Sequence, residues 1–537
     1  MRWWGWGEDA HAMRLPEAAE ARLREELGVQ AGVGTRALSL EDVRLPDASL
    51  PDGLRERLAG VELREDREAR VSHALGKSYP DLVRIRSGDG SSAPDAVVRP
   101  SSAEEIAEVL AACQETEVAV VPFGGGTSVV GGVEPLRDGF AGAVSLDLTR
   151  MDRILEVDRE SLTASVDPGL FGPALEARLQ ARGLTLGHFP QSFEYSTAGG
   201  WVATRSAGQA STGYGRIDEL VEGVRCIAPT GEVTARALPA SAAGPALREL
   251  LVGSEGVLGV LCGLTLRVRP LPQERRYEGW SFQSFEQGCE TFRRLEQEGV
   301  APDVARLSDE QETRLTMTLS SSGSAAERAG RAYLRLRGHE GGCIVIVGFE
   351  GVPETVERRR REAARVLRSG GGLALGVRPG RAWLRNRFAT PYLRDELLDR
   401  GVMIETLETA GTWSGLGALY EAVGGALRAS LSARGTPPLV MCHVSHLYPS
   451  GASLYFTFMA RQERDGAELD QWRAAKGAAC DAIVSAGGTI THHHAVGRDH
   501  APWMEAEVGE RGLDLLRAAK HELDPRGIMN PGKLIPG

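Results

Sequence analysis

The sequence has no long hydrophobic run and no paired cysteines. No stretch of the chain approaches the roughly 18 apolar residues that a membrane-spanning helix requires. The first residues, Met1 to Gly7, form no apolar segment typical of a secretory signal, so we expect a cytoplasmic protein. The seven cysteines stand singly, without Cys-x-x-Cys spacing. We therefore expect buried thiols in a reducing compartment rather than disulfides or a cysteine-bound zinc ion.

An excess of positive charge is also missing. The formal net charge of −11 argues against a nucleic-acid-binding surface. The hydrophobic fraction of 42% and the charged fraction of 25% are those of an ordinary globular protein, and the 537 residues predict two to four domains. Aromatic residues are scarce at 6%, yet Trp3, Trp4 and Trp6 stand together at the start. They either pack on the body of the protein or contact a lipid interface.

The two commonest nucleotide-binding signatures are absent from the most distinctive turn of the chain. The segment Pro122-Phe123-Gly124-Gly125-Gly126-Thr127-Ser128 follows an apolar run, 118–121, that is typical of a buried strand. It is neither GxGxxG nor a P-loop, since no lysine follows the glycines. Three consecutive glycines let backbone N–H groups close on an anion, and the two hydroxyls add donors. The turn therefore predicts a loop that holds a phosphate or pyrophosphate.

The hydrophobic pattern predicts an α+β protein with a domain boundary near Pro272. Residues 8–90 carry helical spacing, as in 17–27 and 54–63. From Ala96 a strand, a helix and a strand lead into the glycine turn, and short β patterns continue to about residue 268. A long segment rich in Gly, Ser, Thr and aromatics, 188–214, is typical of a binding loop. Beyond 273, helices alternate with β runs, which favours an antiparallel sheet flanked by helices.

Three consecutive histidines, His492, His493 and His494, form a second unusual feature. They are a surface run, a metal site or a proton-transfer group. If the run is a strand, neighbouring side chains point to opposite faces and at most two could easily share a metal. No HxxxH spacing or acidic partner accompanies them. Imidazoles that titrate near neutral pH suit proton transfer and anion binding, so we expect no metal.

Three further residues are weaker candidates on the sequence alone. Tyr455 lies in a predicted strand, where a tyrosine usually packs its ring and bonds its hydroxyl to any acceptor. Arg394 could grip a phosphate with its forked guanidinium or simply pair with Asp395 or Glu396. Arg306 is a candidate of the same kind.

Taken together, the segments resemble a known family. Part of the chain resembles the FAD-binding (PCMH-type) domain of the vanillyl-alcohol-oxidase superfamily. The resemblance is carried by the glycine turn and by residues 190–196, 199–206, 214–215 and 254–259. The chain is more specifically similar to the alkyldihydroxyacetonephosphate synthases. This similarity is carried by residues 392–395, 405–409, 450–456 and 492–497. The glycine turn alone indicates the superfamily, whereas the triple histidine together with the Gly-Ala-x-x-Tyr-Phe strand is more discriminating.

The resemblance implies an FAD-dependent transferase of ether-lipid synthesis. It implies exchange of the acyl group of 1-acyl-dihydroxyacetone phosphate for a long-chain alcohol through a flavin N5 adduct, without net oxidation. Tyr455 would be the general acid/base, His492, His493 and His494 would assist proton transfer, and Arg394 and Arg306 would bind substrate. FAD would be held non-covalently, because the glycine loop offers no His or Cys to link it. The implied regions are an N-terminal helical region (1–90), an FAD-binding domain (91–272), a cap or substrate domain (273–490) and a C-terminal segment (491–537) that returns to the flavin.

The flavin contacts implied by the resemblance fall in four segments. They are Pro122, Phe123, Gly124, Gly125, Gly126, Thr127, Ser128, Pro190, Gln191, Ser192, Phe193, Glu194, Tyr195, Ser196, Ala203, Thr204, Arg205, Ser206, Ser254, Glu255, Gly256, Val257, Leu258, Gly259 and Val260.

The chain departs from the family pattern near the histidines. Ala495 stands where the family usually has glycine, and the residues after Gly497 are Arg498-Asp499-His500, more acidic than usual. These departures concern the substrate more than the flavin. A peroxisomal presequence is not evident and the composition suggests a GC-rich bacterial source, so we expect a cytoplasmic enzyme; peripheral membrane contact and a homodimer stay open.

Two other functions compete with the synthase. An FAD-linked oxidase or dehydrogenase of a 2-hydroxy acid or another alcohol is the main alternative. Relatives with metal-assisted hydroxy-acid oxidation carry a His-containing Gly-Asp-Gly-Asn segment, which this chain lacks. A flavin-storing or lipid-binding protein without catalysis is disfavoured, because loss of activity would be expected to erode Tyr455 or the histidines.

Overall fold

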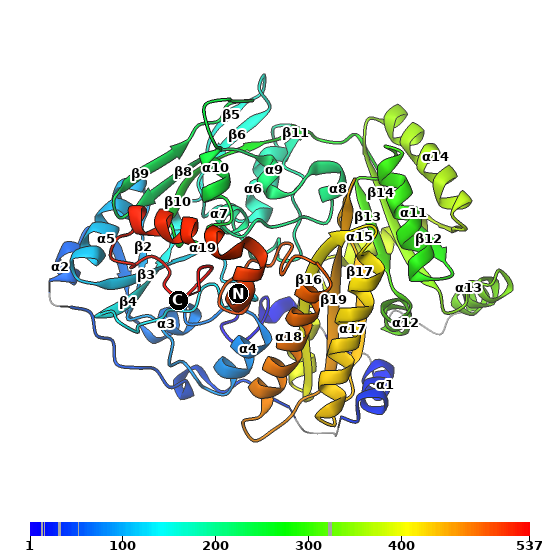
Figure 1. Cartoon of the computed structure of the whole chain (residues 1–537), viewed down its shortest axis with the longest axis horizontal. Helices are drawn as coiled ribbons and strands as arrows, with labels where there is room; N and C mark the ends of the chain where they lie inside the picture. Colours follow the sequence, from blue (N-terminus) through cyan, green and yellow to red (C-terminus); the bar gives the residue numbers. More distant parts are fainter. Residues whose placement is uncertain (12–13, 16, 30–33, 52, 320–324, 537) are drawn as a thin grey trace.

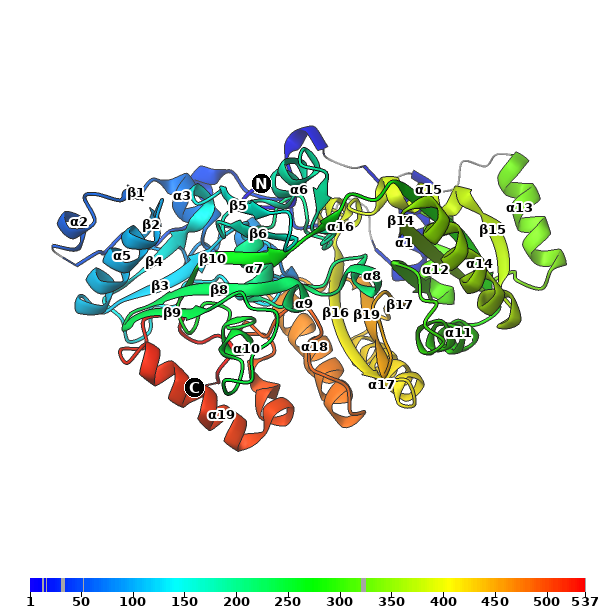
Figure 2. The ribbon, with the colours of Figure 1, turned by 90° about the horizontal axis from the view of Figure 1, so that it is seen from above.

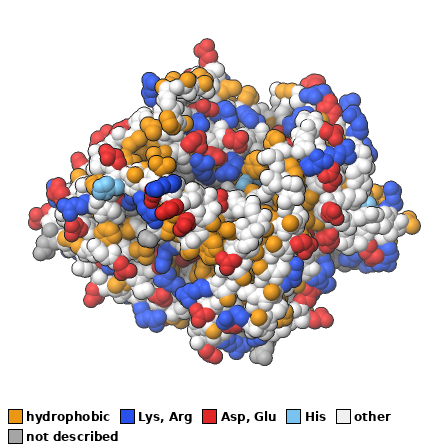
Figure 3. Space-filling model, in the orientation of Figure 1, with side chains coloured by type: hydrophobic (Ala, Val, Ile, Leu, Met, Phe, Trp, Pro, Cys, Tyr) orange, Lys and Arg blue, Asp and Glu red, His pale blue; other side chains and the backbone are white. Residues whose placement is uncertain are grey.

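The computed structural model describes residues 1–11, 14–15, 17–29, 34–51, 53–319 and 325–536. They form two halves that lie side by side, one built on two small sheets and the other on one large sheet (Figure 1). Acidic and basic side chains are interspersed over the face in Figure 3, in keeping with a chain whose charge is spread rather than gathered.

The first sheet ends in the glycine turn. Its order is β1-β2-β4-β3, with β2, β4 and β3 parallel and β1 antiparallel to β2. The elements of this part are α2 (Leu54–Arg57), β1 (Glu62–Arg64), α3 (Arg67–Ser72), α4 (Tyr79–Arg86), β2 (Ala96–Arg99), α5 (Ala103–Glu115), β3 (Val118–Phe123) and β4 (Gly142–Asp147). The predicted helix over 54–63 is wrong at its end: the helix ends at Arg57, and residues 62–64 pair with β2 and extend this sheet.

The second sheet is antiparallel, in the order β5-β6-β10-β8-β9, and a short pair β11-β7 adjoins it. Its elements are β5 (Ile154–Asp158), β6 (Thr163–Val166), α6 (Gly172–Gln180), β7 (Leu184–Thr185), α7 (Ala198–Ala203), α8 (Ser211–Tyr214), α9 (Ile217–Leu220), β8 (Val221–Ala228), β9 (Gly231–Ala235), α10 (Leu247–Leu251), β10 (Val260–Arg267) and β11 (Arg269–Pro270). The predicted loop 188–214 thus contains two short helices, α7 and α8, whose N-cap residues are Thr197 and Ala210.

The large sheet has eight antiparallel strands in the order β15-β12-β14-β13-β17-β19-β16, with β18 paired to β19. Its strands are β12 (Glu274–Phe282), β13 (Val304–Ser308), β14 (Cys343–Gly351), β15 (Leu373–Gly376), β16 (Val402–Thr412), β17 (Leu439–Val444), β18 (Leu447–Tyr448) and β19 (Gly451–Arg461). This is the antiparallel sheet flanked by helices that the pattern predicted, and the α+β fold class is confirmed.

Strand β19 shows how the large sheet divides core from site. Its side chains alternate between faces. Phe456 and Phe458 are fully buried against helices α17 and α18, within the largest hydrophobic cluster. Tyr455 consequently points to the opposite face, the one that adjoins the first half. The remaining helices are η1 (Asp9–His11), α1 (Glu17–Leu27), η2 (Leu40–Asp42), η3 (Leu148–Arg150), α11 (Phe285–Gln297), α12 (Glu310–Leu319), α13 (Ala325–Leu336), α14 (Pro353–Ser369), α15 (Val377–Asn386), α16 (Thr390–Leu398), α17 (Leu416–Ala433), α18 (Glu468–Ser485), η4 (Ala501–Trp503) and α19 (Met504–Leu523).

The C-terminal segment crosses back to the first half. Helix α19 lies beside the two small sheets, far from α13 and α14 at the other end of the molecule (Figures 1 and 2). Its last turn is followed by Met529, which bridges to Val120 of β3. Within the described ranges, no helix has the combined length and apolar character needed to cross a membrane.

The tryptophan-rich start packs against the body of the protein. The backbone N–H of Trp6 donates to Asp395 at 2.9 Å, and the Trp6 ring meets Tyr195 edge-on at 5.8 Å. Arg2 and the fully buried Arg86 both pair with Asp395 and both lie over the Trp4 ring. Of the two alternatives for this segment, the structure places it in internal packing.

Replacing Trp6 tests that packing. We expect Trp6→Ala to lower the free energy of unfolding by about 3 kcal/mol, because a buried aromatic ring would leave a cavity beside Tyr195. Urea unfolding measures the change, with Leu515→Ala, at a 73% exposed position, as the control that should be nearly neutral. An unchanged stability in Trp6→Ala, with reduced binding to lipid vesicles, would assign the segment to a membrane instead.

Candidate active site

The glycine loop and the segment 190–197 are held in direct contact. A Cβ added at Gly125 would lie 1.7 Å from the carbonyl oxygen of Tyr195, and one at Gly124 would lie 2.4 Å from Oγ1 of Thr197. Gly126 has φ +65°, a left-handed conformation that glycine adopts without strain. No side chain therefore separates these two backbones, and N–H groups of the loop stay available for a ligand.

The other two predicted flavin segments meet at the same place. The N–H groups of Gly253 and Glu255 donate to the carbonyls of Val202 and Ala203, at 2.9 and 3.0 Å. A Cβ at Gly256 would lie 2.8 Å from the ring of Pro122. All four segments thus converge. The side chain of Arg205 is an exception, since it turns outward to Glu249 and to the carbonyl of Val252.

The residues at this junction fit FAD. Oγ of Ser254 and Oδ1 of Asn530 are buried polar atoms without a hydrogen-bond partner among the described residues. The amide nitrogen of Asn530 bonds the carbonyls of Glu255 and Gly132, so both orphan atoms adjoin the glycine loop. Buried polar atoms normally find partners, and the phosphates and hydroxyls of FAD would supply them. Backbone donors in a glycine-lined cradle match a pyrophosphate.

Gly125 is the position where FAD binding is most vulnerable. We expect Gly125→Ala to abolish retention of FAD, because the new methyl group collides with the Tyr195 carbonyl and opens the cradle. The flavin absorbance of purified protein, relative to protein concentration, measures this. Gly60→Ala is the matched control, since a Cβ at Gly60 meets open space. A fully yellow Gly125→Ala protein would contradict the assignment.

Tyr455 lies in a row of polar residues across the large sheet. Glu408 of β16 and His443 of β17 are its direct neighbours in the strand register. The ring of His443 stacks on that of Tyr455 at 4.7 Å, and the rings of His493 and His494 lie 5.9 and 5.4 Å away. Burial raises the pKa of Tyr455, while Thr406 and Arg394 lower it, with a net rise. The hydroxyl is consequently protonated at neutral pH.

The three histidines are fixed by one carboxylate. Glu408 is 1% exposed and accepts the backbone N–H groups of His492, His493 (3.0 Å) and His494 (2.7 Å), together with the Thr491 hydroxyl. Burial alone would raise the pKa of Glu408, but the histidines and these N–H groups hold it well below its usual range. The run is therefore a turn wrapped around an anion rather than a strand.

The imidazoles extend into a larger cluster with His446 and Tyr448. Nδ1 of His492 is 2.9 Å from Nδ1 of His493, and its Nε2 is 2.6 Å from the Tyr448 hydroxyl. The ring of His446 stacks on that of His492 at 5.0 Å, and its Nδ1 bonds Ser211 Oγ at 2.5 Å. Burial lowers the pKa of His446, His492, His493 and His494, so they are neutral at pH 7.

His446, His492 and His493 offer nitrogen atoms within 4.8 Å of one another, close enough to consider a shared ion. The third imidazole, His446, lies outside the run of three histidines, whereas the prediction from the sequence compared only the three consecutive residues. The expectation that no metal is used here stays a prediction.

The two candidate arginines lie on the cap side and already have protein partners. Arg394 of α16 bonds the carbonyl of Lys77 and lies 3.3 Å from Glu405, not beside Asp395 or Glu396 in an ion pair. Its positive charge nevertheless lowers the pKa of Tyr455. Arg306 of β13 donates to Glu312 at 2.9 Å and lies 3.1 Å from His443. Arg306 thus stands behind the histidine that stacks on Tyr455.

The two departures from the family pattern have structural accounts. Ala495 has φ +75°, a left-handed conformation that is relaxed for glycine and strained for alanine. Asp499 is turned inward rather than to solvent, where burial raises its pKa to about 7 and the nearby Lys476 lowers it. The added acid is therefore placed near a buried cation of α18.

Several residues of the site have no clear signal in the sequence. Glu408 and His443 are single polar residues in strands, and Arg216 and His446 follow loops. The segment 402–409 shows no regular alternation of charged and apolar residues that could have marked Glu408 as facing the site. The partners it binds lie more than 80 positions further along the chain, which no local pattern shows.

Glu408 offers a test with a defined pH dependence. Glu408→Gln places an amide N–H₂ donor among backbone donors, and we expect it to lower the free energy of unfolding by about 3–5 kcal/mol at pH 7. Because the folded pKa is lowered, the stabilisation by the carboxylate is present above the ordinary pKa of 4.5 and is lost as the pH falls through the folded value. The difference between the two proteins should shrink below about pH 4.5.

Denaturant titrations at several pH values measure that difference. Glu421→Gln, on the exposed face of α17, is the control. A pH-independent difference would show that the charge of Glu408 does not hold the histidine turn.

Comparison with known proteins supports the same site. Residues 94–235 match the family model "FAD binding domain" and residues 271–534 match "FAD linked oxidases, C-terminal domain". The fold and the site therefore define an FAD-dependent enzyme, and its cofactor is FAD.

The most specific similarity is to one group of such enzymes. The chain is 34% identical to the alkyldihydroxyacetonephosphate synthase of Dictyostelium discoideum, covering 94% of this chain and 84% of the relative, and 33% identical to that of Trypanosoma brucei brucei, covering 100% and 92%. A solved structure of an alkyldihydroxyacetonephosphate synthase superposes with a TM-score of 0.86 at 30% identity, over 99% of both chains. The chain belongs to the alkyldihydroxyacetonephosphate synthase family.

Proposed function

We propose that the protein exchanges the acyl group of 1-acyl-dihydroxyacetone phosphate for a long-chain alcohol, giving an ether lipid precursor. The observation that carries the proposal is the placement of Tyr455. It lies among His443, His493 and His494 on the sheet face that adjoins the flavin segments. A protonated phenol beside neutral imidazoles can move protons without a change of redox state.

The residues divide the proton-transfer work by their protonation states. Tyr455, with its raised pKa, is a donor at rest. Nδ1 of His494 is buried and has no hydrogen-bond partner among the described residues, so it can accept the proton that leaves C1 of the substrate. Glu408 holds the backbone on which both His493 and His494 stand, and so orients them toward Tyr455.

FAD would be held by the glycine loop and by the segments 190–196, 203–206 and 254–260. When bound, oxidised FAD supplies an electrophilic N5 that can take up a carbon nucleophile reversibly. Non-covalent attachment stays part of the proposal.

The substrate-binding role of the arginines is part of the proposal as well. Arg394 lowers the pKa of Tyr455 from the cap side and would attract the phosphate of the substrate. Arg306, which contacts His443, would add a second positive charge. Because both substrates carry long alkyl chains, we further propose that the enzyme contacts a membrane surface peripherally. A cytoplasmic location and a homodimer remain part of the proposal.

Anaerobic mixing with 1-palmitoyl-dihydroxyacetone phosphate tests the function. We expect the flavin absorbance to bleach and to return when hexadecanol is added, since the exchange needs no electron acceptor. We expect Tyr455→Phe to retain FAD but to slow the bleaching at least ~100-fold, because the phenolic proton is lost. Tyr333→Phe, at an exposed position of α13, is the control.

Two outcomes would contradict the proposal. Flavin that stays bleached until oxygen is admitted would identify an oxidase of a hydroxy acid or another alcohol. A fully active Tyr455→Phe enzyme would remove Tyr455 from the reaction.

A further inference from the structure

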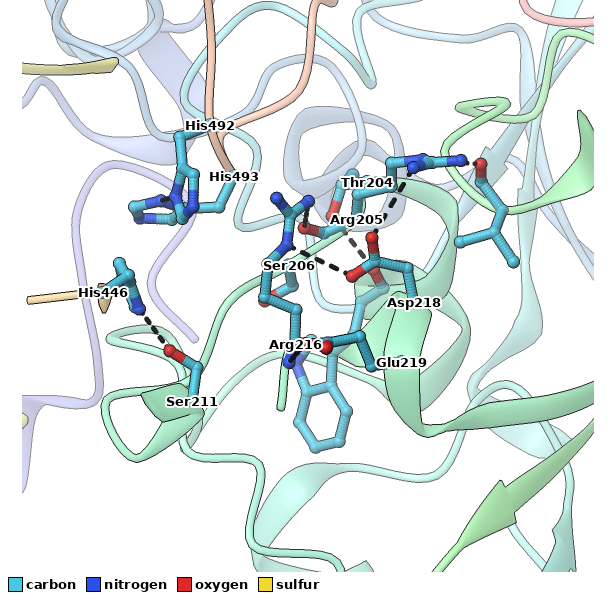
Figure 4. A network of polar contacts seen from close by, with 12 residues as sticks. Thr204, Arg205, Ser206, Ser211, Arg216, Asp218, Glu219, His446, His492 and His493 are labelled. Atoms are coloured by element: carbon cyan, nitrogen blue, oxygen red, sulfur yellow. Dashed lines mark hydrogen bonds and ion pairs between the residues drawn. The ribbon is translucent and has the colours of Figure 1, made fainter. Parts of the chain in front are cut away.

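Arg216 is a partly buried cation of the flavin-binding half. It follows Gly215, which has φ +95°, and precedes α9. Its side chain is 18% exposed. Figure 4 shows it between Asp218 on one side and the group of His446, His492 and His493 on the other. Neither the sequence pattern nor the proposed reaction assigns it a role.

Arg216 is anchored on the flavin-binding half. One terminal nitrogen donates to the carbonyl of Arg205 at 3.3 Å, and Nε lies 3.2 Å from Asp218, without the alignment of a hydrogen bond. Its own backbone N–H donates to Glu219 at 2.8 Å. Toward the histidines, the guanidinium lies close enough to the Tyr448 hydroxyl to lower the pKa of that phenol.

The contacts from Arg216 onward form a chain whose direction is set at its start. A guanidinium has donors only, so a hydrogen bond between these two groups can run only from Arg216 to the oxygen of Tyr448. The Tyr448 hydroxyl then donates its proton to Nε2 of His492, at 2.6 Å. Neutral His492 carries its proton on Nδ1 and donates it to Nδ1 of His493, at 2.9 Å. His493 is left with its proton on Nε2.

We propose that Arg216 is a positioning residue that directs the chain Arg216–Tyr448–His492–His493 and so makes His493 a proton donor toward the substrate. A proton passed from Nε2 of His493 is replaced at Nδ1 from His492, and His492 is reprotonated at Nε2 by Tyr448. The resulting Tyr448 phenolate lies beside the Arg216 cation, which opposes the rise that burial causes in the pKa of Tyr448. The donor role of His493 rests on the proposed function, whereas the tautomers do not.

The charges around the imidazoles support this arrangement. Burial lowers the pKa of His492 and His493; Glu408 of β16 raises it and Arg216 lowers it. The other titratable neighbours are His446, His494, His443, His188 and Tyr455. Loss of the Arg216 charge should consequently raise the pKa of His492 and His493.

Nitrogen NMR of the resting holoenzyme, labelled with ¹⁵N-histidine, tests the tautomers without any substrate. We expect His492 to carry its proton on Nδ1 and His493 on Nε2, and the Tyr448→Phe variant assigns the His492 signal. His73 and His500 should give separate Nδ1–H signals, because each bonds a backbone carbonyl through Nδ1. Arg216→Lys and Arg216→Gln keep a donor and should keep both tautomers. Arg216→Leu should lose the Nδ1–H signal of His492. An Nε2–H tautomer at His492 in the unaltered protein, or an unchanged spectrum in Arg216→Leu, would overturn the proposal.

The pH dependence of turnover separates the effect of the Arg216 charge from the effect of Arg216 on the direction of the hydrogen bonds. Arg216→Gln should move the acid limb of the rate profile to higher pH, Arg216→Lys should leave it near its original place, and Arg216→Leu should also lower kcat about tenfold. Arg225→Leu, which removes a surface ion pair, is the control. Unmoved limbs in both Arg216→Gln and Arg216→Leu would contradict the electrostatic role. If the tautomers are as expected but no acyl exchange occurs, the proposed function fails and the chain of hydrogen bonds stands.

Discussion

The acceptance of three consecutive backbone N–H groups by one buried carboxylate organises this molecule. Glu408 belongs to the large sheet, whereas His492, His493 and His494 belong to the segment that returns to the flavin-binding half. A buried carboxylate is tolerated only when it is fully hydrogen-bonded, and here the backbone of the histidine turn supplies those bonds. The anion therefore fixes the turn, and the turn places the imidazoles beside Tyr455. The same carboxylate offsets the field of Arg216 on His492 and His493.

The walls of the site come from both ends of the chain. Glu255 accepts the N–H groups of Val496 and Gly497, which ties the last flavin segment to the end of the histidine turn. At the other end, Trp6 binds Asp395 next to Arg394 and touches Tyr195 next to the glycine loop. The two halves thus share the residues that close the site, and chemistry on the cap depends on packing in the flavin-binding half.

Local patterns predicted what is locally encoded. The glycine turn after 118–121 is visible in the sequence because a tight approach of two backbones needs several residues without Cβ, and the contacts of Gly124 and Gly125 show that approach. The strand around Tyr455 was predicted as well, but its sequence alone favoured ordinary packing of the ring; the burial of Phe456 and Phe458 on the other face is what shows that Tyr455 points away from the core. Residues 62–64 were mistaken for helix because a three-residue edge strand is specified by its partner β2 rather than by its own period. The roles of Glu408 and Arg216 depend on partners that are distant in the sequence, so no local pattern could predict them.

The proposed function requires that the exchange is redox-neutral. The most direct measurement incubates the FAD-loaded protein with 1-palmitoyl-dihydroxyacetone phosphate and ¹⁸O-labelled hexadecanol in air. Mass spectrometry and an oxygen electrode follow the products. The account predicts one equivalent of palmitate for each ether formed, retention of the label in the ether and no consumption of oxygen. Oxygen uptake with hydrogen peroxide, and no labelled ether, would contradict it.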